Sequence, residues 1–308
     1  MDGYLTAEIS AAALRANVAY LRSLLAPGVR LCPVVKADAY GHGLAVVLPI
    51  LAPLVDGLAV ATPSEAVRVR DLRFDRALLT FFSVVGFMDP GERREALAEL
   101  LASEAILTVT GDEEAELIAE EARRAGRRAI VHVKIDTGMA RSGVWHTEAA
   151  ALLLRVRAHP DLRLTGAYTH FATADEDRDF AREQLIRFHA AVAAGGGRDG
   201  LTLHAANSAA LLELPESHLD LVRPGMAVYG IRPSPLVRDG ALAPALTLKG
   251  RLMQVKNVPA GTGCSYGLDY TFPRDSRVGL VPVGYGDGYL FALGDRATVR
   301  VSGADRPE

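Results

Sequence analysis

The chain has 308 residues, of which 49% are hydrophobic and 23% are charged, and its formal net charge is -3. Such a composition is that of a globular protein and excludes collagen-like, low-complexity and disulfide-scaffold proteins. The small net charge argues against nucleic acid or an anionic membrane surface as a partner. The length is near the limit of a single core, so we predict one large domain and one smaller domain.

Short apolar segments alternate with helical patterns along the first three quarters of the chain. The segments span residues 31–37, 56–61, 76–82, 105–110, 129–135, 162–170, 201–206 and 227–231. This alternation is typical of parallel βα units, and eight such strands form a (β/α)8 barrel. We therefore predict an α/β fold with a TIM-type barrel over residues 1–235, and keep a doubly wound open sheet as the alternative.

Helix start and stop signals lie between these segments. Ser10, Ser64 and Asp112 each precede a helical pattern and are the predicted N-terminal caps. Gly28 and Gly126 follow two of these patterns and are typical of helix ends.

The pattern changes near residue 236. Short alternating runs such as LTLKGRLMQVKNV and RVGLVPVGY are separated by Gly and Pro, which predicts a small all-β domain over 236–308. The terminal VSGADRPE shows no clear last strand. We therefore expect this domain to be incomplete.

The cellular compartment follows from what the sequence lacks. The N-terminus has no basic segment followed by an apolar one, and no run of about 18 residues is free of charges and breakers. Cys32 and Cys264 are too few for a disulfide framework. We expect a cytoplasmic protein.

Lysine is rare in this chain: of 34 basic residues only Lys36, Lys134, Lys249 and Lys256 are not arginine. Lys36 ends the first apolar segment, at the face of a barrel where active sites form. An amine, unlike a guanidinium, can become the nucleophile of a Schiff base. The alternative is a lysine that only extends from a strand end into solvent. Tyr40 follows in a Gly-rich loop and brings a phenol within reach of a phosphate.

Lys134 lies in HVKIDTGMARSG, at the end of another predicted strand. The simplest interpretation is a buried lysine paired with Asp136. Arg141 follows a glycine turn a few residues later. It is either a clamp for a carboxylate or one surface arginine among many.

The last two predicted strands end in similar loops. Asn207 and Ser208 lie where a strand passes into a helix, and Arg223, Gly225 and Met226 lie in RPGMAVYG. Backbone N–H groups and a hydroxyl converge on an anion at such a junction, and the last two loops of a barrel commonly bind phosphate. The alternative for Ser208 is an ordinary helix cap.

Metal-binding patterns are weak. Asp175, Asp177 and Asp179 have the first spacings of a calcium loop, but Phe180 stands where the turn requires Gly. The histidines form no ligand cluster, so we predict no metal site.

Seven motifs, taken together and in order, resemble the alanine racemases, which are pyridoxal 5'-phosphate (PLP) enzymes with a barrel followed by a β domain. The motifs are VVKADAYGHG, KIDTGMARSG, YTHFATADE, HAANSAA, VRPGMAVYGI, GCSYG and VPVGYGDGY. The resemblance implies an isomerase that interconverts L- and D-alanine and supplies D-alanine for peptidoglycan. It also implies a homodimer with shared active sites.

The resemblance assigns the two bases. Lys36 matches the lysine that binds the cofactor covalently and acts as one base, and Tyr266 matches the other base, which comes from the second subunit. Racemisation removes a proton from one face and returns one on the other, so two groups must flank the carbon. Tyrosine has an ordinary pKa of about 10, so it needs nearby cations, and Arg141 and His170 match the family residues around it.

Other matching positions concern the cofactor and the substrate. Arg223 matches the arginine that faces the pyridine nitrogen, where it limits carbanion delocalisation, and His204 matches the residue that supports this arginine. Tyr285 matches a residue of the substrate entrance contributed by the partner subunit. Lys134 matches a lysine that can carry a carbamate and hold Arg141, with Asp136 beside it. The remaining expected cofactor contacts are Tyr40, His170, Asn207, Ser208, Gly225 and Met226.

Family chains continue past the GYGDGY segment with a Met-Asp loop and a late tyrosine, which are not found here. One alternative is therefore a PLP-binding protein with weak or no racemase activity. Another is a serine or broad-spectrum racemase, because a small pocket discriminates poorly against one added hydroxyl. An amino-acid decarboxylase or aldolase on a related barrel is a further alternative, disfavoured by Tyr266 and Arg223.

Overall fold

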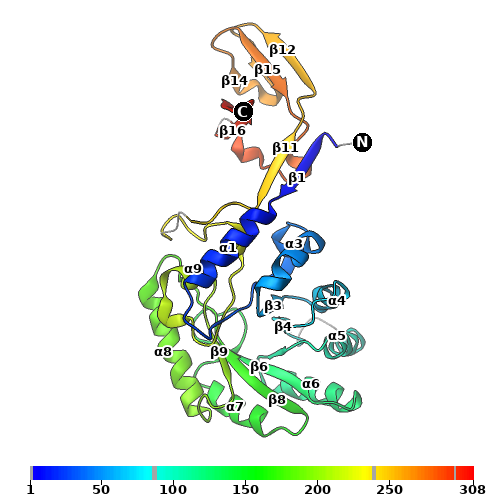
Figure 1. Cartoon of the computed structure of the whole chain (residues 1–308), viewed down its shortest axis with the longest axis vertical. Helices are drawn as coiled ribbons and strands as arrows, with labels where there is room; N and C mark the ends of the chain where they lie inside the picture. The colour runs from blue at the N-terminus through cyan, green and yellow to red at the C-terminus, as the bar shows by residue number, and fades with distance from the viewer. Residues whose placement is uncertain (1–2, 85–88, 238–240, 295) are drawn as a thin grey trace. The chain divides into compact units, whose positions relative to one another are not determined.

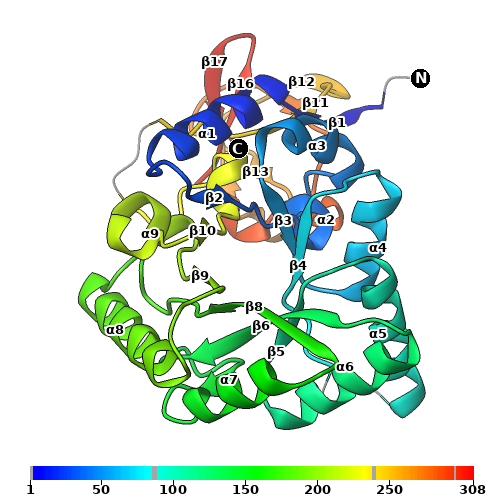
Figure 2. The ribbon, with the colours of Figure 1, turned by 60° about the horizontal axis from the view of Figure 1, so that its bottom comes forward.

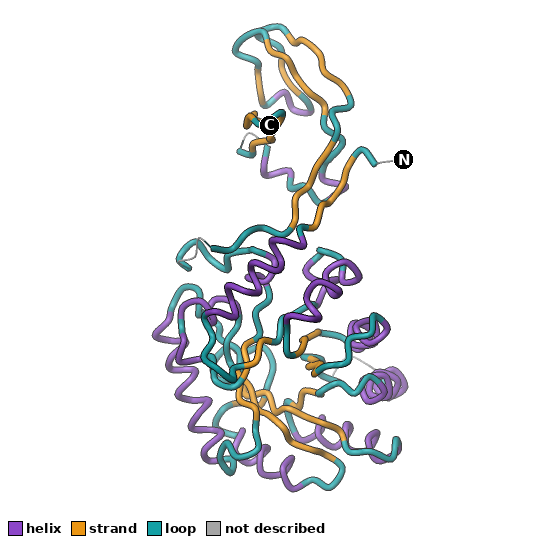
Figure 3. The backbone as a smooth tube through the Cα atoms, viewed as in Figure 1, coloured by secondary structure: helices purple, strands orange, loops and turns teal. Residues whose placement is uncertain are grey.

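The computed structural model describes residues 3–84, 89–237, 241–294 and 296–308. The chain divides into two units, one of Ile9–Ala245 and one of Leu246–Glu308 together with the residues up to Glu8. Figure 1 labels the helices and strands in chain order, and Figure 3 distinguishes them by colour. Among the described residues, no helix is long and apolar enough to span a membrane.

The division falls ten residues later than the expected boundary at 235/236. The side-chain amide of Asn17 donates to the Ala243 carbonyl (2.8 Å), and its oxygen accepts from the Ala243 N–H (2.9 Å). The Ala245 N–H donates to the Tyr229 carbonyl at 2.9 Å. These bonds hold the segment after the last helix of the barrel against the barrel itself. At the other end, β1 (Leu5–Ile9) pairs with β11 (Leu246–Gly250), which assigns the first residues to the smaller unit.

The larger unit is the predicted (β/α)8 barrel, and its helices surround the strands in Figure 2. Among the described residues the barrel strands are β2 (Arg30–Leu31), β3 (Gly57–Val60), β4 (Ala77–Thr80), β5 (Leu107–Val109), β6 (Ala129–Asp136), β8 (Leu162–Tyr168), β9 (Thr202–His204) and β10 (Leu221–Val222). Parallel pairing runs in this order from β2 to β9, with single bridges at Val34–Ala59 and Leu79–Ile106. Between β9 and β10, the N–H groups of Asp220 and Arg223 donate to the carbonyls of Leu203 and Ala206. β10 pairs with β2 and closes the ring.

The eighth strand is not where the sequence predicted it. Residues 227–231 do not form a strand, because Met226–Tyr229 is a 3-10 helix that ends at Gly230 in the left-handed region. The strand that closes the barrel is β10, which has only two residues. A short apolar run looks the same whether it is a buried strand or a buried helical turn, so periodicity does not separate the two.

The helices of the larger unit cover the outside of the barrel. They are α1 (Ala11–Ser23), α3 (Leu44–Leu51), α4 (Pro63–Asp71), α5 (Pro90–Ala102), α6 (Asp112–Arg124), α7 (Ala149–Ala158), α8 (Arg178–Ala194) and α9 (Ser208–Glu213). The segment labelled α2 (Lys36–Tyr40) is a short turn at the end of β2 with non-helical backbone at residues 37–39. Apolar side chains of the strands and of the inward helix faces form the core, as in Val131, Val133 and Ile135, which are fully buried. Parallel strands covered on both faces require such continuous apolar runs.

Of the three predicted caps, Ser10 is confirmed, since its hydroxyl accepts from the Ala13 N–H at 3.2 Å. The other two are displaced. Thr62, not Ser64, caps α4, and it forms a capping box with Glu65. Gly111 precedes α6, and Asp112 is the first helical residue. In both places another residue upstream has the extended backbone that a cap needs.

The smaller unit consists of short antiparallel pairs. β12 (Gln254–Val258) pairs with β15 (Ser276–Leu280), β13 (Gly263–Cys264) with β14 (Tyr270–Thr271), and β16 (Thr298–Val301) with β17 (Ala304–Pro307). The terminal residues, where we saw no clear strand, thus form β17. Ser302 and Gly303 both have positive φ (49° and 83°) and make the two-residue turn that suits a hairpin.

Gly230 offers a test of the barrel's last turn. It has φ +76°, and an added Cβ would overlap the carbonyl of Ala243. We expect Gly230→Ala to lower the free energy of unfolding by about 3 kcal/mol, from strain plus overpacking. Urea unfolding followed by circular dichroism measures this.

Gly126→Ala is the matched control, because Gly126 has φ +65° but open space around it. It should cost only the left-handed strain, about 1 kcal/mol. Equal costs for the two variants would contradict the close approach at Gly230.

Candidate active site

Most of the predicted site residues meet at the carboxyl ends of the barrel strands. Lys36 follows β2, Lys134 lies in β6, His170 follows β8, Ser208 follows β9 and Arg223 follows β10. Because all eight strands are parallel, their carboxyl ends form one face of the barrel. The predicted gathering of these side chains is therefore a consequence of strand direction.

Lys36 begins a left-handed turn that the sequence did not predict. The next four residues, 37–40, all have positive φ between 51° and 58°, although none is glycine. Left-handed backbone costs roughly 1–2 kcal/mol for each such residue, so the surroundings must hold the turn. The Ala37 N–H donates to the Glu65 carboxylate at 2.7 Å.

Asp38 secures the other end of this turn. Its carboxylate accepts from the Leu44 N–H at 2.9 Å and forms an ion pair with Arg68 at 2.8 Å. The turn replaces the end of the predicted first strand, since regular pairing of β2 stops at Leu31. The backbone that carries Lys36 is consequently held by tertiary contacts and not by strand pairing.

Tyr40 ends the turn and lies against one aromatic residue, Tyr229, and one glycine, Gly225. Its ring centroid is 5.3 Å from that of Tyr229, and the Lys36 Nζ is 6.0 Å from the Tyr40 ring. Burial raises the pKa of Tyr40. A Cβ at Gly225 would overlap the Tyr40 hydroxyl, so only glycine allows this phenol beside the Gly225 backbone.

Ser208 is not the helix cap. Asn207 caps α9 by accepting from the Ala210 N–H at 3.0 Å. The Ser208 hydroxyl instead accepts from the Gly225 N–H (2.9 Å) and the Ala227 N–H (3.2 Å). The loops after β9 and β10 are thereby joined, with Met226 as the first residue of the 3-10 helix between these two amides.

Arg223 is only 2% exposed. One terminal nitrogen donates to the Thr169 carbonyl (2.8 Å) and the other to His204 Nδ1 (2.6 Å). Its guanidinium carbon lies 5.1 Å from the centroid of the Tyr168 ring. Burial lowers the pKa of Arg223 to about 10, so the group stays charged at neutral pH. Its Nε is buried and has no hydrogen-bond partner in the described structure.

His204 connects Arg223 to a third buried group. Its Nε2 is 2.8 Å from Nδ1 of His132, and its ring stacks on Tyr168 at 4.8 Å. Burial and the Arg223 charge lower the pKa of His204 well below its ordinary value. This imidazole is therefore neutral.

Lys134 and Asp136 do not form the ion pair that the sequence suggested. Asp136 accepts from four consecutive backbone N–H groups of residues 138–141, at 2.9 to 3.2 Å. Within the described residues no ion pair joins Lys134 to a carboxylate. Lys134 is 7% exposed. Burial, followed by the charges of Arg141 and Arg223, lowers its pKa to about 8.

His170 lies where several positive charges converge. Its pKa lies well below the ordinary value of histidine. Burial is the largest cause, followed by the charges of Arg223, Arg141, Lys134 and Lys36. Like charges held together raise the electrostatic potential, and they favour anionic ligands. The face of the barrel can therefore bind a phosphate or a carboxylate.

Tyr266 and Tyr285 lie in the smaller unit, in short 3-10 turns at 266–268 and 285–287. Their side chains are 91% and 79% exposed. Positive φ at Ser265, Gly267 and Leu268 surrounds Tyr266 and directs the local chain. Both aromatic side chains are therefore largely exposed on short turns.

Three further residues structure this face and belong to none of the predicted site positions: Tyr168, Glu65 and His132. One signal for His132 was present. Side chains alternate along a strand, so His132, Lys134 and Asp136 share one face of β6. Glu65 gave no such signal, because its role depends on α4 lying beside the turn of Lys36.

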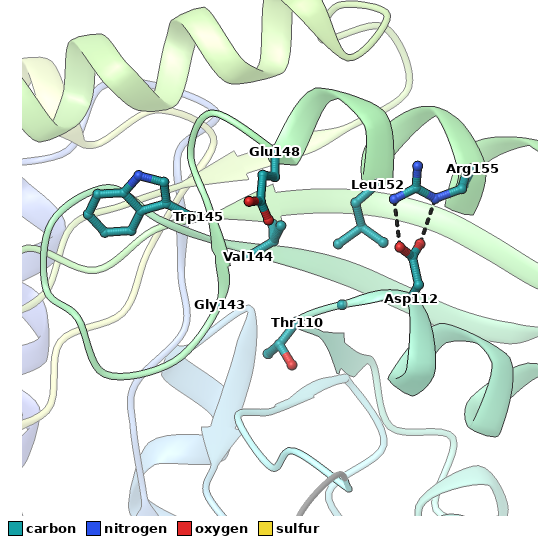
Figure 4. Close-up of a pocket in the computed structure, with 9 residues that line it drawn as sticks. Thr110, Asp112, Gly143, Val144, Trp145, Glu148, Leu152 and Arg155 are labelled. Atoms are coloured by element: carbon teal, nitrogen blue, oxygen red, sulfur yellow. Dashed lines mark hydrogen bonds and ion pairs between the residues drawn. The ribbon is translucent and has the colours of Figure 1, made fainter.

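A separate cavity of about 350 Å³ lies between the start of α6 and α7 (Figure 4). Thr110, Trp145 and Glu148 contribute to its lining. Asp112 and Arg155 form a two-pronged ion pair there, at 2.6 and 2.7 Å. None of the predicted site residues lines this cavity.

The amine of Lys134 can be titrated directly. We expect a pKa of about 8 in buffer free of carbon dioxide, against an ordinary value of 10.5. NMR of the lysine side chains measures it, and Lys134→Arg identifies the signal among the four lysines. Arg141→Gln should raise the pKa only slightly, because burial is the larger cause. A wild-type pKa near 10.5 would show that the amine is solvated.

The lowered pKa of Lys134 also makes the stability of the fold depend on pH. Below pH 8 the amine is charged in both states, and its burial opposes folding. Between about pH 8 and 10.5 the unfolded chain holds a proton that the folded chain lacks, so stability from this group rises with pH. Lys134→Met should flatten that part of the profile, as measured by urea unfolding at several pH values.

Comparisons with known proteins cover nearly the whole chain. The family description "Alanine racemase, N-terminal domain" matches residues 9–233, and "Alanine racemase, C-terminal domain" matches residues 245–307. The alanine racemase of Desulfovibrio desulfuricans is 40% identical over 98% of this chain and 80% of its own length. That of Thermobifida fusca is 38% identical over 99% of this chain and 81% of its own length.

Solved structures give the same result. Alanine racemase from D-cycloserine-producing Streptomyces lavendulae matches with a TM-score of 0.89 and 36% identity, over 98% of this chain and 80% of that one. The enzyme of Streptomyces coelicolor matches with a TM-score of 0.88 and 38% identity, over 98% and 81%. The chain thus spans about four fifths of the length of these relatives.

Proposed function

Because the chain belongs to the alanine racemase family, we propose that it interconverts L- and D-alanine with PLP as cofactor and so supplies D-alanine for the cell wall. The observation that supports this most directly is Arg223, a buried cation with an unpartnered Nε beside the Lys36 face. A buried N–H donor without a partner costs about 1–3 kcal/mol, so a ligand that accepts from it is favoured.

The residues present fit the cofactor in two further respects. Gly225 has no room for a Cβ because the Tyr40 hydroxyl fills that space, which holds the phenol beside the loop after β10, where it can donate to a phosphate. The charges of Lys36, Arg141 and Arg223 suit a phosphate at one end and a substrate carboxylate at the other. Tyr40, Asn207, Ser208, Gly225 and Met226 are the proposed residues on the phosphate side.

When bound, PLP supplies an electron sink that makes the α-proton of alanine acidic. Lys36 would hold it covalently and take or return the proton on one face of the α-carbon. Tyr266 would do so on the other face, in the site of a partner subunit. Such a pair of bases is what inversion of configuration requires.

Arg223 would set the electronics of the cofactor ring. With a pKa of about 10, Arg223 stays protonated at neutral pH and would donate a hydrogen bond to the ring nitrogen. A donor that keeps its proton leaves the ring nitrogen unprotonated, which limits delocalisation of the carbanion. A short-lived carbanion favours prompt reprotonation over side reactions.

Lys134 is a proposed carbamate. An amine reacts with carbon dioxide only when neutral, forming a C–N bond and releasing one proton. With a pKa of about 8, Lys134 is partly neutral at neutral pH. The resulting anion would lie among Arg141, Arg223 and His170, and would hold Arg141 for the substrate carboxylate. Asp136 would shape the same loop through its four amide contacts.

The proposed homodimer is supported by the exposure of Tyr266 and Tyr285. Each would contribute to the site of the other copy, Tyr266 as a base and Tyr285 at the substrate entrance. The charge of Arg141 would stabilise the phenolate of the partner's Tyr266, whereas His170 beside it is neutral, because burial and the nearby cations lower its pKa.

Lys36→Ala tests the cofactor assignment. We expect the absorbance band at about 420 nm of the PLP-loaded protein to disappear, together with D-alanine formation, because the covalent link is lost. The measurement is visible spectroscopy beside a D-alanine assay of the purified 308-residue protein. Lys256→Ala, an exposed lysine in β12, is the control and should change neither. Colour without D-alanine in the wild type would favour a binding protein.

Tyr266→Phe tests the two-base assignment. Racemisation should fall by about 100- to 10,000-fold in both directions, since one base is missing. In heavy water, exchange of the α-proton should persist for only one enantiomer, and the absorbance band should remain. Tyr270→Phe, on the same unit, is the control. Unchanged racemisation in both directions would refute the role of Tyr266.

A further inference from the structure

Three buried groups stand in line behind the barrel face: Arg223, His204 and His132. The Arg223 terminal nitrogen is 2.6 Å from His204 Nδ1, and His204 Nε2 is 2.8 Å from His132 Nδ1. All three are at most 4% exposed. His132 has no place in the proposed mechanism, and its contact with His204 needs a reason.

Hydrogen-bond chemistry fixes the direction of this chain. Arginine has donors only, so His204 Nδ1 must accept. A neutral imidazole carries one proton, and in His204 it is therefore on Nε2. That N–H donates to His132 Nδ1, which must accept in turn, so the proton of His132 is on its own Nε2. Both histidines therefore carry their single ring proton on Nε2.

The surroundings keep the rings in these orientations. His204 stacks on Tyr168 with an interplanar angle of 8°. The far side of the His132 ring lies against Gly166 of β8, where an added Cβ would collide with it. The β6–β8 register shifts at this point, since Val131 pairs with Leu164 but His132 pairs with Gly166. The shift places a glycine opposite the imidazole.

Both imidazoles are neutral. Burial, followed by the charges of Arg30 and Arg223, lowers the pKa of His132 to about 3. A protonated His204 would turn a donor toward the Arg223 donor at 2.6 Å. Two donors at that distance repel each other.

We propose that His132 is a positioning residue that fixes His204 in its Nε2–H tautomer and thereby keeps Nδ1 free to accept from Arg223. Without an acceptor at His132, the buried Nε2–H of His204 has no partner, so the tautomer that accepts from Arg223 is destabilised relative to the Nδ1–H tautomer and the contact with Arg223 weakens. The guanidinium of Arg223, with its unpartnered Nε, is then no longer held in one orientation. The consequence for catalysis rests on the proposed function, whereas the tautomer does not.

The first test uses the wild-type protein without cofactor or substrate. Nitrogen NMR of the chain labelled at histidine distinguishes a ring nitrogen that carries a proton from one that does not, and single substitutions identify the signals. We expect His204 and His132 both to carry the proton on Nε2. A proton on Nδ1 of His204 would overturn the proposal, whatever the protein catalyses.

The second test compares two substitutions of His132. His132→Asn retains an acceptor near the Nδ1 position, whereas His132→Leu fills the space without one. We expect His132→Leu to shift the His204 proton to a mixture of tautomers and to raise the dissociation constant for PLP about tenfold, as for one lost buried hydrogen bond. His132→Asn should remain within about threefold of the wild type.

Equal effects of the two substitutions would show that His132 only fills space, and would overturn the proposal. If His132→Leu does not fold, the wild-type tautomer and His132→Asn still decide it. If the tautomers are as expected but no D-alanine forms in the wild type, the proposed function fails and the positioning role stands.

Discussion

The buried guanidinium of Arg223 is the constraint on which the barrel face depends. A cation removed from water is costly unless polar groups surround it. Here two backbone carbonyls, the Nδ1 of His204 and the face of Tyr168 surround it. Each of these comes from the end of β8 or β9, so the charge also fixes how the last three strands meet. One nitrogen, Nε, is buried without a hydrogen-bond partner.

Backbone strain accumulates at the other side of the same face. The left-handed turn of residues 37–40 is maintained by Asp38 within it and by Glu65 from outside it, and Glu65 also closes the capping box of α4. A single side chain thus stabilises a helix start and the turn that carries Lys36. Such sharing explains how a strained turn survives in a barrel of short strands: its cost is offset by neighbours that are needed elsewhere.

The sequence identified most of the candidate site, because the residues that carry chemistry lie at strand ends and the motifs around them are local. Lys36, Lys134, Ser208 and Arg223 could be named from such motifs. The position of the last strand could not, since Leu221–Val222 is too short to show a period and the apolar run after it is helical. The pairing of Lys134 with Asp136 was also wrong, because four backbone amides bind that carboxylate instead.

What the sequence alone determined is the order of strands and helices, the rarity of lysine and the set of polar residues that follow each strand. These depend on near neighbours in the chain. The tertiary structure decided the contacts between distant residues: Glu65 with Ala37, Ser208 with Gly225, and the line from Arg223 through His204 to His132. Hydrogen bonds of this kind depend on distance in space, which closure of the barrel fixes and local pattern does not.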